Sequence, residues 1–127
     1  MTVIKAFSNS WVTSDRFHED IRLPCIFGCQ DCKDSLAHYL ECDILWTTII
    51  CTYGLDTSWL KASASQRLGL TNPSKTSLTL IAVASRSYHA IKMGNKEVIQ
   101  QTMRDKDFHR IQNLLFEFAA IFSKELR

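Results

Sequence analysis

The stretch Leu23–Trp46, LPCIFGCQDCKDSLAHYLECDILW, holds four of the five cysteines and one of the four histidines of this 127-residue chain. These residues are spaced Cys25-x3-Cys29-x2-Cys32-x5-His38-x3-Cys42. Tetrahedral structural zinc takes four sulfur or nitrogen ligands, often as two close pairs from two local elements. The spacing therefore predicts one zinc site, and we expect this site to decide how the N-terminal third of the chain folds.

One pair of ligands is predicted to lie on a helix. His38 and Cys42 are four residues apart, so in a helix they project from the same face one turn apart. The second pair comes from the loop before that helix, and two choices remain open. Cys29 and Cys32 would form a Cys-x2-Cys knuckle, whereas Cys25 and Cys29 would form a Cys-x3-Cys loop whose glycine allows a left-handed turn. Each choice leaves one cysteine outside the site.

The predicted zinc is structural rather than catalytic. Four protein ligands leave no open coordination position, and no Glu-x-x-His or His-x-Glu arrangement supplies a general base. A redox Cys-x2-Cys pair of the thioredoxin kind begins a helix after a buried strand, and the sequence predicts no such strand here. No Gly-rich phosphate loop or carboxylate pair indicates catalysis. We therefore expect no enzymatic activity and no small-molecule substrate.

Outward from this stretch the sequence predicts helices. Asp34 or Ser35 is suited to cap a helix that runs to Tyr53 and ends at Gly54. Further helices are expected over Thr2–Glu19, from Asp56 or Thr57 to Gly69, from Ser74 or Thr76 to Met93, and over Phe108–Leu126. The predicted fold is mostly α, with about four to five helices and a zinc-binding loop-helix near the N-terminus. We divide it into a zinc module, 1–54, and a helical body, 55–127, packed together as one domain.

Several other residues have simpler expected roles. Cys51, on an apolar helix face, is expected to be a small core residue, and Trp46 is expected in the core as well. A scattered basic set, interrupted by acidic residues, is expected to be a solvated face; it consists of Lys92, Lys96, Arg104, Lys106 and Arg110.

Composition limits the classes of partner. Fifteen Lys and Arg against thirteen Asp and Glu give a formal charge of +2, so charge alone does not indicate a nucleic-acid partner. The most apolar stretch, Leu78–Ala84, is far shorter than the roughly 18 residues that suggest a transmembrane segment. Residues 1–12 lack the features of a secretory signal. Clustered cysteines joined by a histidine favour metal over disulfides, and hence a reducing intracellular compartment.

The stretch Leu23–Trp46 resembles the zinc-binding region that follows the polymerase domain in non-LTR retrotransposon reverse transcriptases. It is most similar to the versions abundant in dinoflagellate genomes, which share a Cys-Gly-Cys-type loop, an acidic spacer and a His-Tyr-Leu-x-Cys segment. The likeness covers roughly residues 9–53, including Asn9–Ser14 and Arg16–Glu19. The chain departs from the pattern at Asp43, where a proline is frequent, and it has no Tyr-x-Asp-Asp polymerase motif. The resemblance thus implies a stand-alone fragment or a domesticated tail.

The resemblance also implies a ligand set and a partner. The implied ligands are Cys25, Cys29, His38 and Cys42. Cys32 then falls in the spacer and remains the alternative to the first of these. A retroelement origin implies an accessory that binds RNA or DNA in the nucleus or cytoplasm. Arg22 and Lys33 are the first candidates for contact with phosphate because they are the basic residues nearest the loop.

A second hypothesis needs no nucleic acid. The near-neutral charge and the strongly apolar last helix also fit an interaction subunit that docks through its helices into a larger protein assembly. Phe116 lies off the main apolar stripe of that helix, and its exposure would indicate a protein partner.

Overall fold

The computed structural model describes residues 23–55 and 75–126. The helices predicted over Thr2–Glu19 and Asp56–Gly69 lie outside these residues, as does Arg22. The described ranges contain five helices: α2 Leu36–Tyr39, α3 Asp43–Tyr53, α5 Lys75–Gly94, α6 Lys96–Asp105 and α7 His109–Leu126. Within them the only β-type pairing is an isolated antiparallel bridge between Pro24 and Lys33. The mostly helical fold is confirmed.

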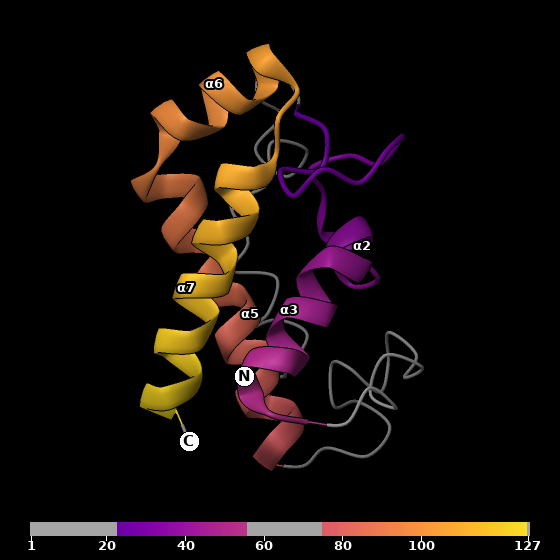
Figure 1. Cartoon of the computed structure of the whole chain (residues 1–127). Helices are drawn as coiled ribbons and strands as arrows, with labels where there is room; N and C mark the ends of the chain where they lie inside the picture. The colour runs from indigo at the N-terminus through magenta and orange to yellow at the C-terminus, as the bar shows by residue number, and fades with distance from the viewer. Residues whose placement is uncertain (1–22, 56–74, 127) are drawn as a thin grey trace.

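Three helices, α3, α5 and α7, form the packed body, and each contacts the other two. Figure 1 shows α5 and α7 running antiparallel, with α6 crossing between them at one end. One side of α5 is apolar and faces the core, since five of its residues are buried: Leu80, Ile81, Ala84, Tyr88 and Ile91. On α7 the buried positions recur every four residues, at Ile111, Leu115, Ala119 and Ser123. This spacing is one side of a helix.

The helix α6 was not predicted. Gly94 and Asn95 read as a stop, and the chain does leave α5 there, but it enters α6 at the next residue. α6 is amphipathic: Val98, Ile99 and Thr102 are buried, and the polar residues between them face outward. A short helix of this kind forms because packing of one face compensates for a polar sequence.

The single helix predicted from Ser35 to Tyr53 is wrong in one respect. Ser35 does cap its start, accepting a hydrogen bond from the backbone N–H of His38 at 3.3 Å, and Gly54 ends it with φ 88°. Between these ends the helix breaks, because Cys42 has extended backbone (φ −66°, ψ 112°) and α3 begins after it. The indole N–H of Trp46 donates to the carbonyl of Tyr39 at 2.8 Å, which satisfies a carbonyl at the end of α2.

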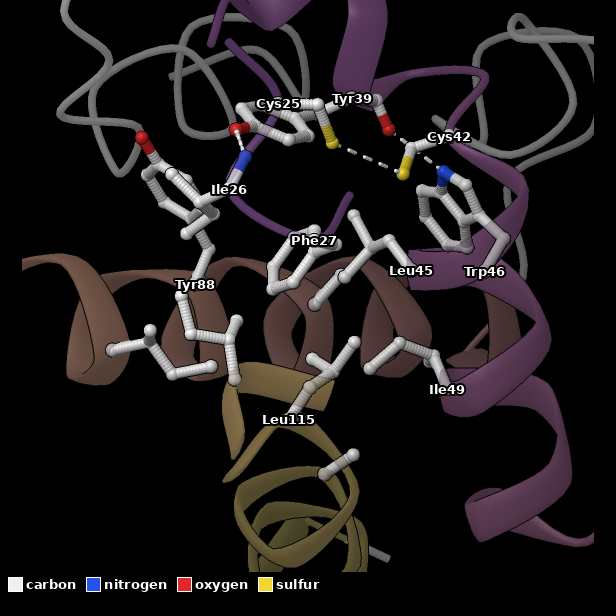
Figure 2. Close-up of a cluster of buried hydrophobic side chains, with 14 of the residues drawn as sticks. Cys25, Ile26, Phe27, Tyr39, Cys42, Leu45, Trp46, Ile49, Tyr88 and Leu115 are labelled. Carbon is white, nitrogen blue, oxygen red and sulfur yellow. Dashed lines mark hydrogen bonds between the residues drawn. The ribbon is translucent and has the colours of Figure 1, made fainter. Parts of the chain in front are cut away.

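One hydrophobic core joins the cysteine-rich segment to the body. Ile26 and Phe27 are fully buried, and Figure 2 shows Phe27 among Leu45, Tyr88 and Leu115, which come from α3, α5 and α7. The side-chain amide of Gln112 on α7 donates to the carbonyl of Phe27 at 3.0 Å. The described part of segment 1–54 therefore shares its core with the described part of segment 55–127.

Trp46 is in the core as expected, with 1% of its surface exposed. Cys51 is not a core residue, and that prediction is wrong: its side chain is exposed on α3. The neighbouring Ile49 and Ile50 take the buried positions instead.

Candidate metal centre

The first half of the site is a tight loop, residues 24–33, which we call the Cys loop. Backbone hydrogen bonds close its base: the N–H of Cys25 donates to the carbonyl of Cys32 at 2.8 Å, and that of Asp34 to the carbonyl of Leu23 at 2.9 Å. Gly28 has φ 103°, a value that favours glycine, and a Cβ there would lie 2.9 Å from Cγ of Phe108. The loop is thus held against the start of α7.

The second half of the site comes from the break between α2 and α3. His38 lies in the single turn of α2, and Cys42 is the N-cap of α3. The expected arrangement of these two residues on consecutive turns of one helix is therefore wrong. The ligand atoms of His38 and Cys42 nevertheless lie within 4.8 Å of each other. Cys42 also faces the Cys loop, where its Sγ lies 3.9 Å from that of Cys25 (Figure 2).

Four potential ligand atoms converge at this point. They belong to Cys25, Cys29, His38 and Cys42, and all lie within 4.8 Å of one another. The Sγ of Cys42 is 3.9 Å from that of Cys25 and 3.6 Å from that of Cys29. Tetrahedral zinc with Zn–S bonds of about 2.3 Å separates its sulfur ligands by about 3.8 Å. The sulfur spacing thus matches a tetrahedral ion.

The imidazole of His38 supports the same fit. Its Nε2 atom is buried and has no hydrogen-bond partner among the described residues. A buried nitrogen without a hydrogen-bond partner lowers the stability of the fold, whereas a bond to a metal ion would satisfy it. Three thiols and one imidazole are also the donors that soft and borderline cations such as zinc prefer. The cluster can therefore hold a metal ion.

Cys32 lies outside this group of four. It is half-buried, and its backbone carbonyl accepts the hydrogen bond that closes the Cys loop. The structure brings the Sγ of Cys25, rather than that of Cys32, to the other three ligand atoms. Of the two choices that spacing left open, the geometry favours the Cys-x3-Cys pair.

The thiols perturb one another strongly. The hydrogen bond with Cys42 lowers the pKa of Cys25 to about 5, although burial opposes this. The same hydrogen bond, together with burial, raises the pKa of Cys42. Burial and the charge of Cys25 raise the pKa of Cys29 to about 11. The three thiols therefore resist ionising together, and a bound dication would favour the ionised form of all three.

A buried carboxylate lies beside the metal cluster. The Asp34 side chain is fully buried. Its Oδ1 accepts hydrogen bonds from the hydroxyls of Tyr39 at 2.6 Å and Tyr88 at 2.7 Å, and its Oδ2 accepts one from the ammonium of Lys92 at 2.5 Å. Burial, and then the charge of Asp34, raises the pKa of Tyr39 well above its usual range. We call these four residues the Asp34 network.

The Asp34 network corrects the prediction for Lys92, and the buried role of Asp34 was not predicted from the sequence. Lys92 was expected on a solvated face, but its side chain is 8% exposed and paired with Asp34. The other basic residues of that set, Lys96, Arg104, Lys106 and Arg110, are exposed as expected. The sequence around Asp34 indicates only a helix cap. No local signal connects it with Lys92, which lies 58 residues away.

Of the two residues predicted to contact phosphate, the one that the structure describes, Lys33, belongs to a segment whose other exposed charged side chains are acidic. Lys33 is exposed at the end of the Cys loop, and Arg22 lies outside the described residues. In residues 23–43 the other exposed charged side chains are those of Asp31, Glu41 and Asp43. The described part of this segment therefore offers no basic patch to attract a phosphate backbone.

Comparison with other proteins adds no relative. No protein-family model, no curated protein and no solved structure matches the chain. Among the described helices, none combines the length and the apolar character that crossing a lipid bilayer requires.

Proposed function

We propose that this chain is a structural-zinc helical module. Cys25, Cys29, His38 and Cys42 would hold one Zn²⁺, which fixes the Cys loop to α2 and α3. The observation that carries the proposal is the convergence of these four donors within 4.8 Å, with the Nε2 of His38 buried and without a hydrogen-bond partner among the described residues. Bound zinc would supply folding free energy, because an unfolded chain does not present a preformed site.

The proposed zinc has no catalytic role. Four protein donors fill a tetrahedral coordination sphere and leave no position for water or substrate. Cys25 and Cys42 are also fully buried, which keeps bulk solvent from that side of the cluster. We accordingly propose a scaffold rather than an enzyme.

Elemental analysis and a cysteine series test the zinc site. We expect one zinc per purified chain, and Cys29→Ser and Cys42→Ser should lose it. Cys32→Ser should retain zinc because its thiol lies outside the cluster. Cys51→Ser, which changes an exposed cysteine, is the matched control. A wild-type chain that purifies without zinc, and does not take it up when refolded with it, would contradict the proposal.

For the role of the scaffold, we propose docking into a protein assembly. Two large apolar side chains on α7 support it: Phe116 is 57% exposed and Ile121 is 50% exposed. Phe116 is the stronger of the two, because aromatic side chains are enriched at the buried centre of protein interfaces. The acidic surroundings of Lys33 favour the same choice over nucleic acid.

The alternative is a nucleic-acid-binding accessory of retroelement origin. It is supported by the resemblance of Leu23–Trp46 and by exposed Lys33. A salt titration separates the two roles, because phosphate contacts make affinity fall steeply with salt. We expect no binding of labelled RNA or DNA at about 50 mM salt, where such contacts are strong. Submicromolar, salt-sensitive binding would replace docking with the nucleic-acid role.

A further inference from the structure

The Asp34 network connects the two halves of the metal cluster. The hydroxyl of Tyr39 donates to Asp34 and accepts a hydrogen bond from the backbone N–H of Ile26 at 3.2 Å. Figure 2 shows this contact between Tyr39 and Ile26. Ile26 follows Cys25 in the Cys loop, and Tyr39 follows His38 in α2. Asp34 therefore holds Tyr39, which follows a donor in one half of the site. Through Tyr39 it also holds Ile26, which follows a donor in the other half.

The same carboxylate is held in place from α5. Lys92 and Tyr88 lie on this helix, one turn apart, and both donate to Asp34. α5 contributes none of the four donors of the cluster. A buried carboxylate needs a counter-charge and hydrogen bonds, so loss of the Lys92 ammonium would favour movement of Asp34 toward solvent or its protonation. Either change would disturb Tyr39, and through it the spacing of the Cys loop and α2.

We infer that Asp34, Lys92 and Tyr88 are positioning residues of the metal site, and that α5 thereby sets how tightly the metal is held. The inference rests on the proposed zinc site and adds to it a set of residues that touch no metal. Partners that orient metal ligands from outside the first coordination sphere commonly change affinity by about 10- to 100-fold. Because the Asp34 network acts through Tyr39 and Ile26, we expect the lower end of that range.

The test compares metal affinity in the full chain. Zn²⁺ affinity is measured by competition with a chromogenic chelator, and Co²⁺ is used as a spectroscopic probe of sulfur ligation. Lys92→Met should weaken Zn²⁺ binding by about tenfold. Tyr88→Phe removes one of the hydroxyls that donate to Asp34, and it should weaken Zn²⁺ binding by a smaller factor. Lys92→Arg should restore most of the affinity because it keeps the charge.

Leu80→Ala is the matched control. Leu80 is buried on the same helix, three turns from Lys92, and its truncation lowers stability without touching Asp34. We expect it to lower the melting temperature at least as much as Tyr88→Phe, but to leave Zn²⁺ affinity within about twofold of the wild type. The Co²⁺ charge-transfer and d–d bands should change shape in Lys92→Met and not in Leu80→Ala.

The outcomes separate this inference from the zinc proposal. If the wild-type chain binds neither Zn²⁺ nor Co²⁺, both are overturned. If the wild-type chain binds metal and Lys92→Met and Tyr88→Phe bind it as tightly as the wild type, the positioning role alone is overturned. The same holds if Leu80→Ala also loses Zn²⁺ affinity in proportion to its loss of stability. Should Lys92→Met fail to fold, the comparison of Tyr88→Phe with Leu80→Ala decides the matter.

Discussion

His38 is the one nitrogen donor in the proposed zinc site, and its replacement is the most direct test of the ligand set. His38→Asn should lose zinc, because the shorter side chain cannot reach the position that buried Nε2 occupies. His89→Asn, on the exposed side of α5, should keep one zinc per chain. Zinc content measured by mass spectrometry of the native protein distinguishes the two variants. Retention of zinc by His38→Asn would remove this histidine from the ligand set.

Metal uptake should release about two protons per ion near pH 7. The pKa of Cys25 is about 5, so this thiol is already ionised, whereas the pKa values of Cys29 and Cys42 are raised and both thiols must lose a proton. Apparent affinity should therefore rise as pH increases toward the raised pKa values and fall as pH decreases. Calorimetry in buffers of different ionisation enthalpy counts the protons directly. Release of none would contradict this ionisation pattern.

Gly28 tests the fit between the Cys loop and the start of α7. Gly28→Ala should lower the free energy of unfolding by about 1–3 kcal/mol, because φ is 103° and the new Cβ would lie 2.9 Å from the ring of Phe108. Gly94→Ala is the control, since nothing lies within 4 Å of a Cβ there. Urea denaturation with zinc present gives both values. Equal stability of the two variants would mean that the loop can move away from Phe108.

At the scale of elements, local sequence signals predicted the ends of helices well and their interruptions poorly. Ser35 and Gly54 act through their own backbone neighbourhood, so a cap and a left-handed end could be predicted from residue type. The break at Cys42 could not, because it depends on an indole N–H that reaches the carbonyl of Tyr39. The spacing of His38 and Cys42 is compatible with a continuous helix as well as with the broken helix that the structure has.

The same distinction explains α6 and the Asp34 network. Gly94 and Asn95 resemble a helix end in isolation, and only the packing of Val98 and Ile99 shows that a new helix follows at once. Three members of the cluster, Cys29, His38 and Cys42, could be predicted from residue type and spacing, whereas spacing alone left Cys25 and Cys32 as alternatives. Lys92 carried no such signal, since its partner lies on a distant segment.

The two sides of α7 should differ sharply when truncated. Leu115→Ala should lower the free energy of unfolding by about 2–5 kcal/mol, because the side chain is fully buried between helices. Phe116→Ala, one residue along, should change it by less than about 0.5 kcal/mol because the ring is 57% exposed. Chemical denaturation measures both. A large loss in Phe116→Ala would mean that this ring is buried in the protein as it exists in solution.

At the scale of the whole molecule, metal removal should affect the helical body as well as the Cys loop. Ile26 and Phe27 are fully buried in the core that α3, α5 and α7 share. A chelator should therefore lower the melting temperature of the helical circular dichroism signal in one cooperative transition. The chain reconstituted with zinc is the control. Separate transitions for the loop and the helices would contradict a shared core.

The distance along the chain between Asp34 and Lys92 has a consequence for synthesis. The two residues are 58 positions apart, so at about 5–20 residues per second the ribosome adds the lysine roughly 3–12 s after the aspartate. All four metal donors precede Lys92 in the sequence. Once Cys42 has been added, and for the 50 residues from there to Lys92, the nascent chain carries the complete set of thiol and imidazole groups without Lys92. From the positioning role proposed for Lys92, we expect tight metal loading only late in translation or after it, when α5 has formed and joined the Cys loop.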